Sequence, residues 1–235
     1  MIAIKDLNLK LNKKVILKDI NIDIAEGLYG VLGPNGSGKT SLFRCFCGLY
    51  DNYTGKIDFT PINERKKVSI GYLPQKFTIL PGLKVLDVMT YFAALKGINR
   101  RDRIKCIDEC LELVNMQKYK FEAGDRMSGG MIRRIGIAIA LMGGSDILLL
   151  DEPTVGLDPE ERIQFRNIID SLREDRCILV STHVVEDIRG ICDKIIILNK
   201  GMLVYYGGEK ELEEKAENKE GSLEDGYLWV IRNGL

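Results

Sequence analysis

The sequence predicts an α/β fold in which a core sheet carries an N-terminal antiparallel β-subdomain and an inserted α-helical subdomain. Three observations support this prediction. Residues 28–32 form a short apolar run that leads into a glycine-rich loop and then into helical periodicity over 39–47. Residues 81–141 show helical periodicity throughout. From residue 147 strand and helix patterns alternate, which is typical of sheets connected by right-handed crossovers.

The N-terminal part has the alternation expected of antiparallel strands. Strand patterns occupy 4–11, 15–17 and 20–24, and Asn12-Lys13-Lys14 forms a turn between the first two. We expect residues 1–32 to form antiparallel strands that lead into the glycine loop. Residues 56–60 and 68–73 predict two further strands, the second of which ends at Pro74-Gln75.

The middle of the chain predicts the helical subdomain, over about residues 76–141. A first helix is predicted by apolar residues at 83, 86, 89 and 91–95. A second helix is predicted by Ile104, Ile107, Leu111 and Val114, which recur at the helical period of 3.6 residues.

The last third returns to the α/β pattern. Residues 147–150 are fully apolar, which is typical of a strand buried in a parallel sheet. A helix then begins at Pro159, and the pattern predicts a strand at 177–181, a helix at 184–191, a strand at 195–198 and a hairpin partner at 202–206. The tail, about 209–235, has a charged helix and an apolar patch around Leu223 and residues 227–230 that docks a terminal helix. We expect residues 1–235 to form a single domain.

Composition limits the possible partners and compartment. Thirty-four basic residues balance 34 acidic ones, so no global field favours nucleic acid. No apolar run approaches the roughly 20 residues of a membrane span, and the N-terminus lacks a signal-peptide plan. The six cysteines have no companions at zinc-site spacing, so we expect free thiols in a cytosolic protein.

The glycine loop fits the phosphate-binding loop of P-loop nucleoside triphosphatases, so the core sheet is predicted to be of that type. Its eight residues are Gly33, Pro34, Asn35, Gly36, Ser37, Gly38, Lys39 and Thr40. Glycines let backbone N–H groups point inward, and the helix N-terminus adds positive charge. Lys39 is expected at the β- and γ-phosphates and Thr40 on Mg²⁺. The alternative, an ordinary glycine turn, is disfavoured by the strand and helix that flank the loop.

Two carboxylates, Asp151 and Glu152, follow the apolar strand 147–150. Ligands of open α/β sheets sit beyond the carboxyl ends of the strands, so both residues are expected beside the phosphate loop. Asp151 suits Mg²⁺ held through water, and Glu152 suits the general base that polarises the attacking water. The alternative is a strand that simply ends in an acidic turn.

These motifs resemble those of the ATP-binding cassette (ABC) ATPases over residues 2 to about 208. Residues 151–154 and 156–158 resemble the Walker B motif and the D-loop, which contains Asp158. Residues 127–131 resemble the family signature, with Met131 in place of the usual glutamine. Gln75 lies where the family has its Q-loop glutamine. His183, the only histidine, follows Ser181-Thr182 as in the switch motif.

The resemblance implies a mechanism. Two cassettes, as a homodimer or a heterodimer, pack head to tail, and each ATP lies between the phosphate loop of one chain and Ser128, Gly129 and Gly130 of the other. ATP and Mg²⁺ are the implied cofactors. Gln75 would sense Mg²⁺ and link the site to an integral membrane permease, and His183 would position the γ-phosphate and water. Hydrolysis would then open the dimer.

Two positions depart from the family pattern. Met131 lies at the edge of the expected phosphate contact, so we expect hydrolysis to survive. Leu11 occupies the place of the aromatic residue that stacks on adenine, and a leucine covers the base without a π-face. We therefore expect weakened base selectivity.

The function implied is an ATP-hydrolysing subunit that energises a separate permease, most like those paired with ABC-2-type exporter permeases. It would be cytoplasmic and peripheral at the inner face of the cell membrane, with no nucleic-acid partner. Two alternatives remain: a soluble cassette ATPase that acts on ribosomes or DNA, and an ATP-binding regulatory switch. The sequence does not identify the cargo.

Overall fold

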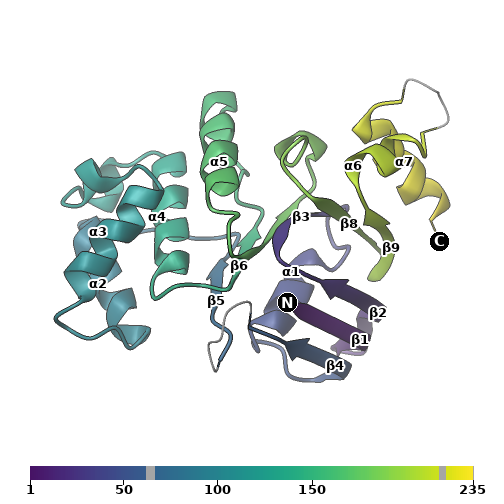
Figure 1. Cartoon of the computed structure of the whole chain (residues 1–235), viewed down its shortest axis with the longest axis horizontal. Coiled ribbons are helices and arrows are strands. Elements are labelled where there is room, and N and C mark those ends of the chain that lie inside the picture. Colours follow the sequence, from purple (N-terminus) through teal and green to yellow (C-terminus); the bar gives the residue numbers. More distant parts are fainter. Residues whose placement is uncertain (62–66, 217–220, 235) are drawn as a thin grey trace.

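The computed structural model describes residues 1–61, 67–216 and 221–234, and a six-stranded sheet forms its centre (Figure 1). The strand order is β5-β6-β7-β3-β8-β9, with the first five strands parallel and β9 antiparallel to β8. Their bounds are β5 Ile70–Leu73, β6 Ile147–Asp151, β7 Cys177–Thr182, β3 Gly27–Leu32, β8 Lys194–Asn199 and β9 Met202–Gly207. The predicted α/β fold class is confirmed.

A three-stranded antiparallel sheet, in the order β2-β1-β4, packs beside the central sheet (Figure 1). Its strands are β1 Ile2–Leu11, β2 Lys14–Ile24 and β4 Tyr53–Phe59. Two expectations were wrong here. The segments 15–17 and 20–24 are one continuous strand, β2, which passes Asp19 at φ 50°. Residues 28–32 belong to the parallel sheet, because burial on both faces suits a central strand.

Side chains of the central sheet alternate between two hydrophobic cores. In β6, Leu148 and Leu150 enter the core that contains the inserted helices, whereas Ile147 and Leu149 enter the core beneath the antiparallel sheet. The second core also contains the buried residues of helix α1 (Lys39–Phe46). Because the buried face of α1 packs in this second core, the position of the loop that precedes α1 is fixed.

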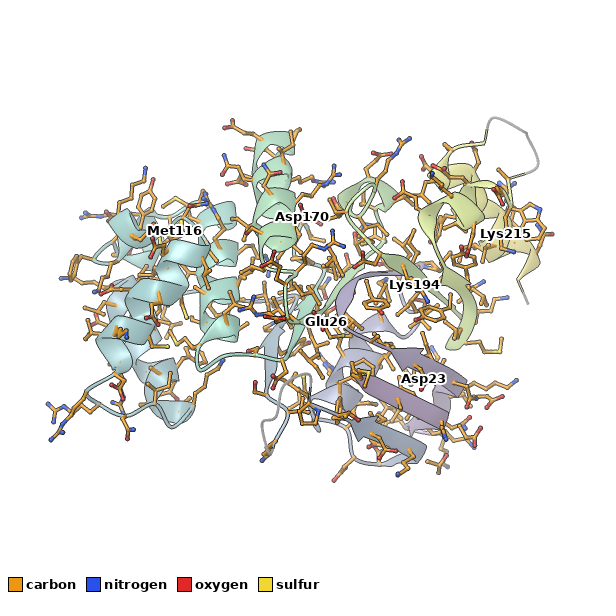
Figure 2. The ribbon with its side chains drawn as sticks, viewed as in Figure 1. Asp23, Glu26, Met116, Asp170, Lys194 and Lys215 are labelled. Carbon is orange, nitrogen blue, oxygen red and sulfur yellow. The ribbon has the colours of Figure 1, made fainter. Side chains whose placement is uncertain are left out.

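The inserted helices form one end of the molecule (Figure 1). They are α2 Val85–Leu95, α3 Arg103–Leu113 and α4 Gly129–Leu141, with short 3-10 turns at Gln117–Tyr119 and Gly124–Arg126. Met116, labelled in Figure 2, is fully buried among them. Of the four residues that the periodicity placed on one apolar face, Ile107, Leu111 and Val114 are buried as predicted, whereas Ile104, in the first turn of α3, is exposed. Leu83 instead precedes α2 and is exposed, because the helix begins only at Val85.

The C-terminal third contains α5 Pro159–Ser171, α6 Glu209–Glu213 and α7 Leu223–Asn233. Helix α7 docks through Leu223 and Val230, as the apolar patch predicted. The Lys215 ammonium, labelled in Figure 2, lies over the rings of Tyr205 and Trp229. Residues 217–220 of the predicted charged helix lie outside the described residues.

The helix expected at 184–191 was also wrong. The structure has only a 3-10 turn, η3, at Val185–Asp187. The Thr182 hydroxyl accepts the Val184 N–H, and Gly190 has φ 71°, so the segment is held in a non-helical path at both ends. Across the described ranges of the chain, we find no helix with the length and apolarity needed to cross a bilayer.

Candidate functional site

A cavity of about 640 Å³ lies at the carboxyl end of β3, beside the glycine loop. Several segments that are distant in sequence meet around it. They are the start of β2, the loop and first turn of α1, the second residue after β5, the residue after β6 and the β8–β9 turn. The lining residues are Lys14, Val15, Ile16, 35–41, Gln75, Glu152 and Lys200. The structure thus brings Gln75 and Glu152 to the phosphate loop, as the sequence predicted.

The loop has a backbone that demands glycine. Gly33, Gly36 and Gly38 have φ values of 153°, 81° and 111°. A Cβ at Gly33 would lie 2.2 Å from the carbonyl oxygen of Leu198, and one at Gly38 would lie 2.7 Å from Leu17. Helix α1 then begins with no acidic residue in its first turn, so its positive N-terminus stays available to an anion at the cavity.

The Lys39 side chain is folded back over the loop and is only 6% exposed. Its Nζ donates to the carbonyl oxygens of Gly33, at 2.7 Å, and Pro34, at 3.3 Å. It also lies 3.4 Å from Glu152 Oε1. A buried ammonium requires such partners. The Lys39 ammonium therefore lies at the cavity wall. A bound polyanion would replace the carbonyl oxygens of Gly33 and Pro34 as its hydrogen-bond acceptors.

Ser37 gives independent evidence that the loop fits a ligand. Its hydroxyl is buried, yet Oγ has no hydrogen-bond partner among the described residues. Buried polar atoms of native proteins are normally paired. A phosphate group bound in the loop would supply the missing partner.

Asp151 is fully buried and joins three elements. Its Oδ1 accepts hydrogen bonds from Thr40, at 3.1 Å, and from Ser181, at 2.6 Å, and its Oδ2 accepts one from the Tyr72 hydroxyl at 3.4 Å. Burial, with a smaller contribution from Asp151, raises the pKa of Tyr72 to about 12, so this phenol remains a donor.

These oxygen donors suit Mg²⁺. Thr40 and Asp151 place a hydroxyl and a carboxylate next to each other, and Gln75 is on the wall of the same cavity. Within the described part of the chain, no three His, Cys, Asp or Glu side chains form a complete metal site. Mg²⁺ does not require one, because it commonly takes one or two protein ligands together with water and substrate phosphates.

Glu152 lies between a lysine and a histidine. Its Oε2 is 2.7 Å from His183 Nδ1, and its side chain is almost fully buried whereas His183 is half-exposed. The backbone of Glu152 has φ 48°, a left-handed conformation that is uncommon outside glycine, and its N–H donates to Ser181. This constraint directs the carboxylate into the cavity, where it can accept a proton from water.

The signature residues lie elsewhere. Ser128 caps α4 and accepts the Met131 N–H at 3.2 Å, while its hydroxyl donates to Glu161 Oε1 at 2.8 Å. Asp158 caps the neighbouring helix α5 by accepting the Glu161 N–H. Gly129 has open space around its Cα, and a Cβ at Gly130 would lie 2.4 Å from the Glu161 carboxylate. Neither Ser128 nor these glycines line the cavity of their own chain.

Leu11 is not among the lining residues. It faces Lys14 across the β1–β2 hairpin and packs against the second core. The hairpin instead presents Lys14, Val15 and Ile16 to the cavity. Two of these three hairpin residues, Val15 and Ile16, are aliphatic.

Several residues of the site were missed by the sequence analysis. Tyr72 and Ser181 contact Asp151, and the Arg133 guanidinium donates to the carbonyl of Pro74, next to Gln75. Burial lowers the pKa of Arg133 from its ordinary value. Ser181 had a usable signal, because it is the residue before the last one of β7, a strand of the same type as the one that carries Asp151. Arg133 lies inside the sequence of α4, and no pattern there indicates that it contacts the site.

Comparison with known proteins shows which family has this sequence and fold. Residues 17–155, more than half of the chain, match the family model for the ABC transporter. An ABC transporter ATP-binding protein of Methanocaldococcus jannaschii, MJ1023, is 33% identical over 216 residues, which cover 91% of this chain and 80% of MJ1023. The linearmycin resistance ATP-binding protein LnrL of Bacillus subtilis is 29% identical over 219 residues, which cover 90% of this chain and 70% of LnrL.

Solved structures agree. The dimeric structure of MJ0796, a bacterial ABC transporter cassette, superposes with a TM-score of 0.73 at 26% identity and covers 88% of this chain and 98% of that one. The same cassette is known in a post-hydrolysis state bound to ADP and Pi. The chain therefore belongs to the ABC transporter family, as an ATP-binding ATPase subunit.

Proposed function

We propose that two copies of this chain, or this chain and a related cassette, pack head to tail around two ATP molecules to drive a separate membrane permease. One observation carries the proposal. Lys39, Thr40 and Glu152 line one cavity, with Asp151 hydrogen-bonded to Thr40, whereas Ser128 caps a helix and does not line that cavity. A site divided in this way needs a second chain, and the dimeric structure of MJ0796 supports that arrangement.

The loop side of the site binds the triphosphate. The Lys39 ammonium would exchange the carbonyl oxygens of Gly33 and Pro34 for β- and γ-phosphate oxygens, and Ser37 would donate its unpaired hydroxyl. Mg²⁺, held by Thr40 and through water by Asp151 and Gln75, would neutralise charge that develops on the phosphates.

Glu152 then serves as the base for hydrolysis. A water molecule attacks the γ-phosphorus, the bond to the bridging oxygen of ADP breaks, and the proton of the water passes to the Glu152 carboxylate. Lys39 and His183 hold that carboxylate from both sides. The imidazole of His183 does not line the cavity in the free chain, and its half-exposed side chain would contact the γ-phosphate in the closed dimer.

The experiment that tests this function is a phosphate-release assay with ATP and Mg²⁺, combined with recovery of the chain from cell extracts. Mg²⁺-dependent release and recovery with an integral membrane protein are expected. Recovery with ribosomes or nucleic acid would favour the soluble alternative, and binding of ATP without turnover would favour the regulatory switch.

Placement at the inner face of the cell membrane, in the cytoplasm, is part of the proposal. Four large apolar side chains of the inserted helical subdomain are exposed, and we propose them as contacts for a permease: Leu80, Leu83, Tyr91 and Leu95. The name of LnrL, a resistance protein, supports an exporter, and an ABC-2-type permease is the partner that we propose.

Engagement of the second chain requires Ser128 to release Glu161. A serine hydroxyl has one proton, and here Ser128 donates it to the Glu161 carboxylate. A γ-phosphate competes for that proton and is also repelled by the carboxylate. We expect Glu161→Gln to lower the ATP concentration for half-maximal dimerisation by roughly fivefold, because a neutral acceptor holds the hydroxyl less strongly. Light scattering in a Glu152→Gln background measures this.

The matched control is Glu160→Gln. Glu160 occupies the same first turn of α5, but its exposed carboxylate accepts from Gln164 rather than from Ser128. It should leave the ATP dependence of dimerisation unchanged. A higher ATP requirement in Glu161→Gln would show that Glu161 instead orients Ser128 for the phosphate of the partner.

Base selectivity should be weak, because the hairpin wall of the cavity is aliphatic. Val15 lines the cavity and is 47% exposed, so an aromatic ring fits there without disturbing the core. We expect Val15→Tyr to tighten ATP binding by up to about tenfold through stacking. Titration with ATP and GTP measures both affinity and discrimination.

Leu11→Tyr is the comparison variant, since the family resemblance assigns the stacking position to residue 11. If Leu11→Tyr gains more affinity than Val15→Tyr, the base lies against β1 and the aliphatic wall is not its contact. Equal ATP and GTP binding by the wild type and both variants would show that neither position contacts the base.

A further inference from the structure

Asp187 is a buried carboxylate that the proposed hydrolysis does not use. It ends the 3-10 turn η3 and is only 2% exposed. Its Oδ2 accepts hydrogen bonds from the hydroxyls of Thr154, at 2.5 Å, and Thr182, at 2.8 Å. Its Oδ1 accepts from the guanidinium of Arg162 at 3.3 Å. A buried carboxylate that accepts hydrogen bonds from three donors holds the segments that carry those donors in place.

The three donors come from the segments that carry the hydrolytic residues. Thr154 lies two residues after Glu152, and Thr182 immediately precedes His183. Arg162 lies on α5 and also donates to the Leu157 carbonyl, beside Asp158. One carboxylate therefore joins the loop after β6, the end of β7 and the start of α5.

The backbone alone does not fix Glu152 relative to His183. The pairing of β6 with β7 ends at Asp151 and Ser181, and the last contact between the two backbones near the site is the Glu152 N–H bonded to the Ser181 carbonyl. The bonds of Asp187 to Thr154 and Thr182 add a side-chain connection between the segments that carry Glu152 and His183, whose own contact is 2.7 Å long.

We propose that Asp187 is a positioning residue for hydrolysis: it ties the β6 and β7 ends together and so holds Glu152 and His183 in contact. The inference rests on the proposed function, in which Glu152 faces the attacking water. Asp187 does not line the cavity, so it acts on the geometry of the pair and not on the nucleotide.

The carboxylate is required because of the number of donors. Three N–H or O–H groups share two acceptor oxygens, and an asparagine offers only one oxygen, with an amide that is itself a donor. Asp187→Asn therefore preserves the size of the side chain but leaves a donor facing Arg162 or a threonine. We expect kcat to fall by about 10- to 100-fold, because small displacements of catalytic groups have effects of that size, and KM for ATP to change by less than about twofold.

A second measurement reports the geometry without any turnover. His183 is the only histidine of the chain, so the ¹⁵N chemical shifts of one imidazole report its contact with Glu152. Asp187→Asn should move these shifts, because the Nδ1 contact loosens. Glu186→Gln is the matched control. It replaces the neighbouring carboxylate of the same turn, which is 62% exposed and pairs with Arg189, and should change neither the shifts nor kcat.

Thr154→Val keeps the proposal testable if Asp187→Asn does not fold. It removes one donor, preserves the shape of the side chain, and should move the imidazole shifts in the same direction with a smaller loss in kcat. Wild-type imidazole shifts in a folded Asp187→Asn or Thr154→Val variant would overturn the inference. If the wild type released no phosphate, the proposed function would fail, and the imidazole shifts would still decide the role of Asp187.

Discussion

Glu152→Gln is expected to lower ATP hydrolysis by about 100-fold or more, because an amide cannot take the proton of the attacking water. Glutamine has the shape of the carboxylate that it replaces. Its amide can still contact both His183 and the Lys39 ammonium, so ATP binding should survive. The variant should therefore accumulate as an ATP-bound dimer that does not separate, measurable by phosphate release and light scattering on the same sample.

Two outcomes would contradict this expectation in different ways. If the variant with ATP stays monomeric, the arrangement with Ser128 of a second chain is wrong. If hydrolysis persists near the wild-type rate, the base is another group, and His183 is the next residue to test because it contacts Glu152 directly. Glu160→Gln, on an exposed turn, should hydrolyse ATP normally.

The phosphate loop and the two carboxylates were predictable because each is encoded locally. The loop conformation needs a positive φ at three positions, and each of them is a glycine in the sequence. A run of four apolar residues identifies β6. The parallel sheet then determines that the end of β6 lies near the end of β3. That general rule placed Asp151 within hydrogen-bond distance of Thr40, 111 residues away.

The conformation of residues 184–191 was not predictable from local pattern. The apolar spacing favours a helix, but the hydroxyl of Thr182 takes the Val184 N–H, and Asp187 is drawn inward by Thr154, which lies 33 residues earlier. Side-chain hydrogen bonds of this kind compete with helix formation. Their partners depend on tertiary structure, which a periodicity analysis does not contain.

The same limit explains Glu161. Ser128 and Asp158 are the caps of α4 and α5 in the structure. That the side chain of Glu161 lies against Gly130 and accepts from Ser128 follows only from the tertiary structure, which brings the first turns of α4 and α5 together. Leu11 shows the converse: alignment by motif assigns it to the base, and this stays a prediction, because the hairpin residues that line the cavity are Lys14, Val15 and Ile16.

Lys39→Met is expected to lower ATP affinity by about 100-fold, which corresponds to the loss of charged hydrogen bonds to the phosphates. Methionine keeps part of the aliphatic stem, which is buried, but removes the ammonium. Binding of a fluorescent ATP analogue measures the loss. Affinity within about threefold of the wild type would mean that the loop N–H groups and α1 bind the phosphates without Lys39.

The same substitution should also destabilise the free protein, because the almost fully buried Glu152 carboxylate loses the ammonium 3.4 Å away and the Gly33 carbonyl loses its donor. The double variant Lys39→Met/Glu152→Gln separates the two effects.

Removing the unpaired Glu152 charge should restore much of the decrease in unfolding midpoint temperature, measured by thermal denaturation without ATP, while ATP binding stays weak. If binding returned together with stability, Lys39 would matter for ATP only by keeping the cavity folded. If neither returned, the Gly33 carbonyl would be the dominant partner of Lys39, and the contact with Glu152 would contribute little to the fold.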